Sequence, residues 1–103
     1  MKEQLVTEIT TALKVHYPEF KGVYFFGSQS RGNSTTNSDW DFAIVFDRKI
    51  DWKFKDEISG ILYDIMLKNN VVIDSHIYST SEILHPRTPF CEIVLKEGVF
   101  YGA

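Results

Sequence analysis

The sequence predicts an α/β fold in which short strands alternate with helices. Apolar runs of strand length occupy residues 23–27, 39–45 and 71–77, and helical apolar spacing recurs before the first and between the later runs. Chains that alternate in this way form layered α/β structures. The 103 residues are 44% hydrophobic and 24% charged, which is ordinary globular usage and sufficient for one core. We expect one domain over residues 1–103.

The first helix and the first strand are separated by a proline. Residues at helical spacing, stopped by Pro18, predict the helix: they are Leu5, Val6, Ile9, Ala12, Leu13 and His16. A strand at about 23–27 follows, and the acid-bearing strand comes next.

The later helices are predicted from their caps. Asp51 caps a helix that ends near Asn69 and Asn70, with the apolar stripe Phe54, Ile58, Ile61, Leu62 and Ile65. Residues 79–82 (Ser-Thr-Ser-Glu) resemble a capping start for a short helix, which follows the strand at 71–77. Residues 89–96 predict a last helix, closed by Gly98.

The segment Gly-Ser-Gln-Ser-Arg-Gly, which begins at Gly27, directly follows the first strand. Gly27 permits a sharp turn and a close approach to a ligand. Ser28 offers a hydroxyl and a backbone N–H at the start of a short helix, where anions are favoured. Arg31 adds a guanidinium that can grip a phosphate. These residues predict a phosphate-binding turn.

Acidic residues alternate along the next strand. Asp39 and Asp41 share one face of it, because side chains alternate across a strand. Two neighbouring carboxylates repel unless a cation lies between them, and oxygen ligands suit Mg²⁺. Asp74 is the only acid within the later apolar run, where we expect its burial to be costly unless it is paired or coordinated. His76 shares its face and could contact substrate, although a partly buried structural histidine is the simpler interpretation.

Each feature alone also has an ordinary structural explanation. A Gly-Ser turn after a strand is common, and Asn37-Ser38-Asp39 can serve as a strand boundary. Their combination with a third acid favours a nucleotidyl-transfer site. Rival phosphate motifs are absent from the sequence, since no Lys follows a Gly-rich loop and no Gly-x-Gly-x-x-Gly occurs.

The combined motif resembles that of the DNA polymerase beta type nucleotidyltransferase superfamily, in particular its minimal single-domain branch. The matching residues are Gly27, Ser28, Arg31, Gly32, the run Ser38-Asp39-Trp40-Asp41-Phe42, Asp74 and the tail Glu97-Gly98-Val99. The resemblance implies a small mixed sheet flanked by helices.

The resemblance also implies roles for the site residues. Gly27 and Ser28, with Arg31 and Ser38, would bind the nucleoside triphosphate, with ATP as the expected substrate. Asp39 and Asp41 would bind two Mg²⁺ ions. Asp74 would be the third ligand and a possible base for the attacking hydroxyl.

The acceptor is left open by the sequence. Members of the minimal branch pair with helical HEPN proteins as toxin and antitoxin, which implies transfer of AMP to a tyrosine or another hydroxyl of such a partner. One alternative is a binding module that neutralises the partner by contact, without catalysis. Another is adenylylation of a small molecule such as an aminoglycoside.

Composition narrows the other classes of function. The net charge of −3 and the lack of a basic face argue against a nucleic-acid polymer as substrate. No apolar stretch approaches a membrane span, and the N-terminus lacks a signal-peptide hydrophobic region. The lone Cys91 predicts a buried thiol rather than a nucleophile, because it lies in an apolar helix. A reducing cytoplasm fits this usage.

Overall fold

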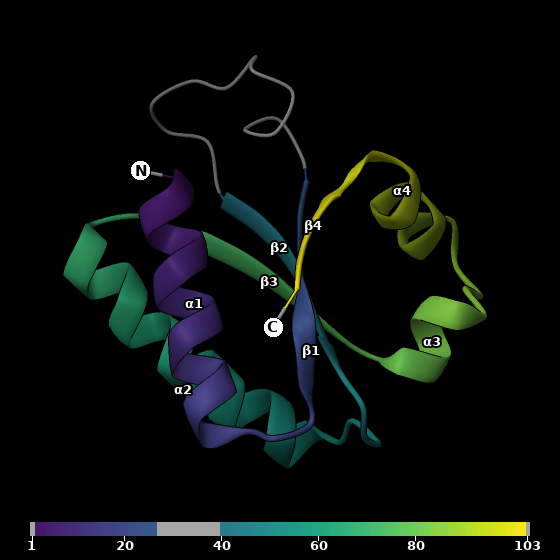
Figure 1. The fold of residues 1–103 in the computed structure, drawn as a ribbon, viewed down its shortest axis with the longest axis horizontal. Coiled ribbons are helices and arrows are strands. Elements are labelled where there is room, and N and C mark those ends of the chain that lie inside the picture. The colour runs from purple at the N-terminus through teal and green to yellow at the C-terminus, as the bar shows by residue number, and fades with distance from the viewer. Residues whose placement is uncertain (1, 27–39, 103) are drawn as a thin grey trace.

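Four helices and four strands form a layered α/β unit in a computed structural model that describes residues 2–26 and 40–102 (Figure 1). In chain order the elements are α1 (Lys2–His16), β1 (Phe20–Phe26), β2 (Trp40–Phe46), α2 (Trp52–Asn69), β3 (Ile73–Ser79), α3 (Thr80–Leu84), α4 (Pro89–Glu97) and β4 (Val99–Gly102). None of the helices in these ranges is long and apolar enough to cross a membrane.

The sheet is mixed, with strand order β3-β2-β1-β4. β1 runs antiparallel to both β2 and β4, whereas β2 and β3 are parallel. The parallel pair is joined by α2, as parallel strands require a crossover connection. The expected mixed sheet is therefore confirmed, and β4, which was not expected, occupies one edge of it.

The caps that the sequence predicts are present. Asp51 accepts a hydrogen bond of 2.8 Å from the backbone N–H of Phe54, which starts α2. Asn70 ends that helix in the left-handed conformation, with φ of 55°. Ser79 and Glu82 form a reciprocal capping box at α3. These local signals fixed the helix boundaries to within one or two residues.

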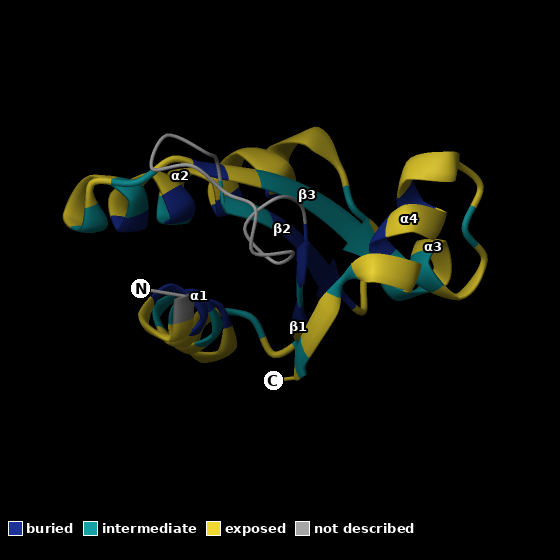
Figure 2. Ribbon diagram, turned by 90° about the horizontal axis from the view of Figure 1, so that it is seen from above, coloured by how far each residue is buried: buried dark blue, intermediate teal, exposed yellow. Residues whose placement is uncertain are grey.

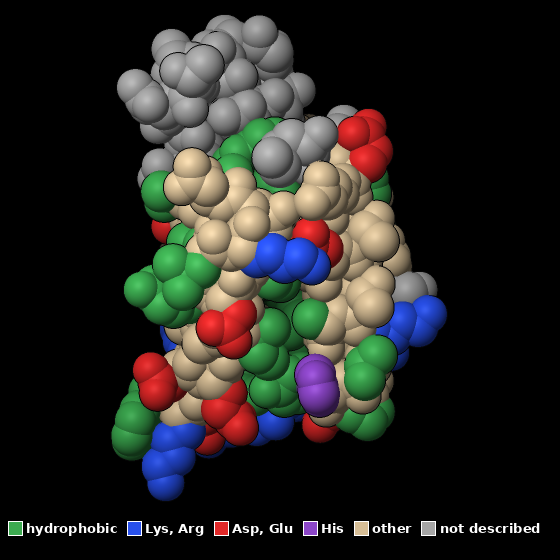
Figure 3. All heavy atoms as spheres, turned by 90° about the vertical axis from the view of Figure 1, so that its left-hand side faces the viewer, with side chains coloured by type: hydrophobic (Ala, Val, Ile, Leu, Met, Phe, Trp, Pro, Cys, Tyr) green, Lys and Arg blue, Asp and Glu red, His purple; other side chains and the backbone are tan. Residues whose placement is uncertain are grey.

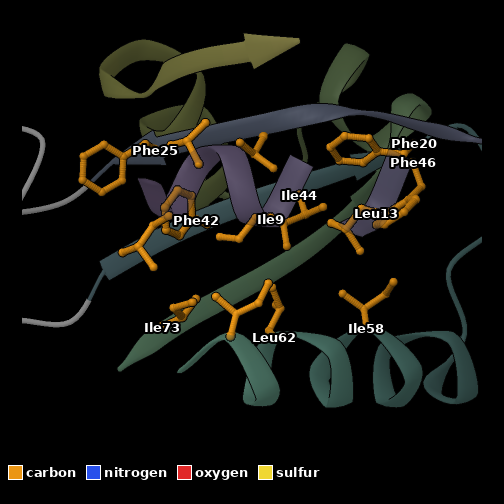
Figure 4. Packing of buried hydrophobic residues seen from close by; sticks show 14 of the residues in the cluster. Ile9, Leu13, Phe20, Phe25, Phe42, Ile44, Phe46, Ile58, Leu62 and Ile73 are labelled. Carbon is orange, nitrogen blue, oxygen red and sulfur yellow. The ribbon is translucent and has the colours of Figure 1, made fainter. Parts of the chain in front are cut away.

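The main core lies between the sheet and the helix pair α1 and α2 (Figure 4). It is built from alternate residues of the strands and one stripe of each helix; labelled members are Ile9, Leu13, Phe20, Phe25, Phe42, Ile44, Phe46, Ile58, Leu62 and Ile73. Figure 2 shows the same division, with buried positions on β1 and β2 and exposed positions on the outer faces of the helices. This layer anchors the acid-bearing strands.

A polar contact joins α1 to α2 at the surface. Asn69 donates a hydrogen bond of 3.1 Å to Glu8 and accepts one of 2.8 Å from Gln4. The bond from Asn69 is the main cause that lowers the pKa of Glu8.

A groove of about 470 Å³ runs between the two helices, with Ala12 and Ile65 among its lining residues, and Figure 3 shows hydrophobic side chains in the hollow of this face.

A smaller layer covers the opposite face of the sheet. α3 and α4 lie there (Figure 1), and Val94 of α4 packs with Phe26 and Ala43. Tyr24 and Tyr78 border this cluster. The acids on β2 and β3 face the same side as this smaller layer.

Gly22 allows β4 to pack closely against β1. Its φ is 148°, and a Cβ at this position would lie 2.6 Å from both the Tyr101 carbonyl oxygen and a ring carbon of Phe100. The register between β1 and β2 also shifts between Phe20 and Gly22, as in a β-bulge.

We predict that Gly22→Ala lowers the free energy of unfolding by roughly 2 to 4 kcal/mol, because it adds backbone strain and a steric clash. Gly60→Ala is the matched control: nothing lies within 4 Å of the added Cβ in the exposed middle of α2, so we expect a gain of about 0.5 to 1 kcal/mol. Urea unfolding of both variants measures the difference. A Gly22→Ala variant as stable as the parent would contradict this account of β4.

Candidate active site

The parallel register of β2 and β3 sets two acids side by side. Asp41 pairs directly with Asp74, and Ala43 pairs with His76. Parallel neighbours lie about 4.8 Å apart in the sheet. The flanking residues Phe42 and Ile73 are buried in the main core, so alternation directs both carboxylates to the other face.

The surroundings of Asp74 differ from the expectation. Its side chain is 53% exposed, and it is the second residue of β3 rather than a mid-strand residue in the core. The expected burial cost is therefore wrong: the strand's apolar residues face the core, while Asp74 faces away near the strand's start. The carboxylate is open to an incoming ligand.

His76 lies next to Asp74 within an aromatic cluster. Its Nε2 is 3.6 Å from the Asp74 carboxylate, a contact that becomes an ion pair when the imidazole is protonated. Its ring centroid is 4.6 Å from that of Phe90 on α4 and 5.9 Å from that of Phe26 on β1. The side chain is 33% exposed. The partly buried histidine is confirmed, and Phe90 is a neighbour of the site that the sequence analysis did not identify.

Five predicted site residues lie outside the described residues. They are Gly27, Ser28, Arg31, Ser38 and Asp39. β1 ends at Phe26, β2 begins at Trp40, and Phe26 pairs with Asp41. The chain therefore leaves and re-enters the sheet at the same end of the strands at which Asp41 and Asp74 lie.

The donor chemistry at this edge suits a hard cation. Carboxylate oxygens on adjacent strands are ligands that Mg²⁺ accepts, usually together with substrate phosphates. Within residues 2–26 and 40–102, no group of three metal-binding side chains is close enough to hold an ion. Asp41 and Asp74 contribute two carboxylates, and the third expected ligand, Asp39, lies outside those ranges.

Cys91 is a buried residue of α4. It is 3% exposed, and its thiol donates a hydrogen bond of 3.7 Å to the carbonyl of Glu82. Burial is the main cause that raises the pKa of this thiol, and it also raises the pKa of the nearby Tyr78 phenol. The prediction of a buried thiol is confirmed.

The fold and the paired acids define an α/β protein with an acidic site at one sheet edge. The family model for "Polymerase beta, Nucleotidyltransferase" matches residues 7–99. The chain therefore belongs to this family of nucleotidyltransferases.

Two curated relatives are similar in sequence. A putative protein adenylyltransferase of Methanocaldococcus jannaschii is 32% identical over 100 residues, which cover 94% of each chain. Protein adenylyltransferase MntA of Aphanizomenon flos-aquae is 40% identical over 42 residues. That match spans 41% of this chain and only 28% of the MntA relative.

Solved structures share the fold. A toxin-antitoxin crystal structure with AMP-PNP has a TM-score of 0.70 at 22% identity, covering 94% of this chain and 73% of the other. A complex of tri-AMPylated Shewanella oneidensis HEPN toxin with MNT antitoxin has a TM-score of 0.67 at 19% identity, covering 100% and 74%.

We predict that Cys91 reacts with a disulfide reagent at pH 8 at least about ten-fold more slowly than a free thiol, because thiolate is the reactive form and burial disfavours it. The absorbance of the thiolate that the reagent releases measures the rate of the reaction with Cys91. Unfolding in urea should restore full reactivity, and fast labelling of the folded chain would contradict the burial of Cys91.

Proposed function

We propose that this chain transfers AMP from ATP to a tyrosine hydroxyl of a HEPN-type partner, in a Mg²⁺-dependent reaction, and so acts as an antitoxin. The observation that carries the proposal is the register pairing of Asp41 with Asp74 on one open face of the sheet. Relatives named protein adenylyltransferases, and a related fold seen with an AMPylated HEPN toxin, support it. ATP and Mg²⁺ are both available in the cytoplasm, where we place the reaction.

In this proposal the acids hold the metal. Asp39 and Asp41 provide two carboxylates from one strand face, and Asp74 provides the third from β3. Mg²⁺ bound there would neutralise the triphosphate and the charge that develops during transfer. The donor set fits a hard cation because its ligands are all oxygen atoms.

Residues before β2 would bind the nucleotide. Gly27 allows close approach of the backbone, and Ser28 offers its hydroxyl and N–H to the phosphates. Arg31 adds a bidentate donor. Ser38 completes the set that the family motif implies. Together they would orient the α-phosphate toward Asp74.

In this proposal AMP transfer is a single displacement at the α-phosphorus of ATP. The acceptor oxygen attacks the α-phosphorus of ATP, forming a new P–O bond, while the bond from that phosphorus to the bridging oxygen of the β-phosphate breaks. Pyrophosphate leaves with the electron pair. The hydroxyl proton passes to the Asp74 carboxylate, whose exposed oxygens are open to an incoming group.

We predict that Asp41→Asn reduces AMP transfer by at least roughly 10²- to 10³-fold, the loss that follows removal of one preorganised electrostatic group. Asp56→Asn, an exposed change on α2, is the control that preserves activity. Transfer is measured with radiolabelled ATP. Equal transfer rates for Asp41→Asn and Asp56→Asn would show that Asp41 is not part of the active site.

Thermal melting separates a chemical role from a structural one. Mg²⁺ with ATP should raise the melting temperature of the parent, because both bind only the native state. A variant with Asn at positions 39, 41 and 74 should melt near the parent without ligand and lose that rise. A collapsed fold in Asp41→Asn would instead make this acid structural.

Intact-mass spectrometry tests the acceptor. We predict that the chain alone, with Mg²⁺ and ATP, shows little self-modification, because Asp74 is exposed and most ligand sites enclose their ligand. Adding the protein encoded beside its gene should add one or more AMP units to that protein. The triple Asn variant is the matched control.

Two outcomes would replace the proposal. If the neighbour is bound and silenced equally well by the triple Asn variant and gains no mass, the chain is a binding module. If the neighbour stays unmodified while an aminoglycoside gains AMP, the acceptor is a small molecule.

A further inference from the structure

β3 is an edge strand whose outer side is open among the described strands. It pairs with β2 on one side only in the order β3-β2-β1-β4. The other edge, β4, has four residues, whereas β3 has seven. Short strands, charged side chains and proline protect sheet edges from unwanted pairing; β3, with the sequence IDSHIYS, has seven residues, no lysine or proline, and Asp74 as its one acid.

The hydrogen-bond pattern identifies which backbone groups face outward. The Trp40 N–H donates a bond of 2.9 Å to the Val72 carbonyl. In a parallel ladder, bonding to the partner strand involves every second residue, so the even-numbered residues of β3 bond to β2. The N–H and C=O groups of Ser75 and Ile77 therefore point away from the sheet.

A groove follows this open edge. Its volume is about 300 Å³, and four consecutive residues of β3, 75–78, line it. Lys55 and Ser59 of α2 border it from one face of the sheet, and Glu82 of α3 borders it from the other. The groove therefore follows a stretch of backbone whose outward-facing groups pair with none of the described strands.

The groove leads to the paired acids. Asp74 directly precedes Ser75, and its carboxylate is more than half exposed on the face that also carries Asp41. A residue opposite Asp74 on an added strand would place its Cβ about 4.5 to 5.5 Å from that of Asp74. Asp41 lies one strand further into the sheet, so a tyrosine at this position would lie over Asp74 and point toward Asp41.

We propose that the acceptor protein binds through an extended segment outside its helices, which is added to the β3 edge with its tyrosine opposite Asp74. The identity of the acceptor rests on the proposed function, whereas the docking mode rests on the edge itself. Main-chain hydrogen bonds to Ser75 and Ile77 supply affinity and fix the direction of the tyrosine. The side chains of His76 and Tyr78 line the same face and contact the residues beyond the tyrosine.

Amide hydrogen exchange tests the docking without any substitution. In the ¹⁵N-labelled chain alone, the Ser75 and Ile77 amides should exchange fast, whereas those of His76 and Tyr78, which bond to β2, should exchange slowly. Adding the unlabelled protein encoded beside the gene should slow Ser75 and Ile77 by at least ten-fold. A partner that contacts side chains only would leave these two amides fast, and the inference would fall.

Proline substitution tests the same bonds by function. Ser75→Pro removes an N–H that the sheet does not use, as edge strands tolerate. Transfer to the partner should fall at least ten-fold relative to Ser75→Ala, which keeps the N–H, while the rise in melting temperature with Mg²⁺ and ATP is retained. Equal transfer by the two variants overturns the inference.

The outcomes separate docking from catalysis. Protection of Ser75 and Ile77 by a partner that gains no AMP would uphold the docking and overturn the proposed function. Transfer without protection would uphold the function and overturn the docking. Absence of both effects would overturn both.

Discussion

The parallel register between β2 and β3 is the constraint on which the site depends. Phe42 and Ile73 bury their side chains in the main core, and a one-residue slip would turn the acids into that core. Burying each large apolar side chain is worth about 1.5 to 3 kcal/mol. Repulsion between two carboxylates in water is about 1 kcal/mol at similar separation. Core packing therefore holds Asp41 and Asp74 together before any cation binds.

The crossover through α2 enforces that register. The helix begins at the Asp51 cap and ends at the left-handed Asn70, so its length is fixed by local chemistry. Its buried stripe then lies over the strands it connects. The smaller layer of α3 and α4 covers the opposite face only in part and leaves Asp74 exposed. The face packed against α1 and α2 stabilises the sheet, and the other face leaves the Asp74 carboxylate accessible to ligands.

Local signals in the sequence predicted much of the fold, and long-range contacts were missed. The caps at Asp51 and Ser79 follow from short patterns, whereas the pairing of Asp41 with Asp74 was expected from an acid within an apolar run and from the family motif. The sequence does not predict the strand Val99–Gly102, because four mostly exposed residues give no periodic signal and their pairing depends on Gly22. The contact of Phe90 with His76 joins separate elements, which no spacing reveals. The residues outside the described ranges stay predictions.

Exposure of Asp74 links partner binding to chemistry in the proposed reaction. A half-exposed carboxylate interacts with its neighbours through water, where charges a few ångströms apart gain only about 1 kcal/mol. A segment docked along β3 would cover Asp74 and lower the local dielectric, which strengthens every charge interaction in the site. The acceptor would then supply both the hydroxyl and the enclosure. In this proposal the open site would transfer AMP efficiently only to the protein that closes it, because the docked segment would also exclude water from the reaction.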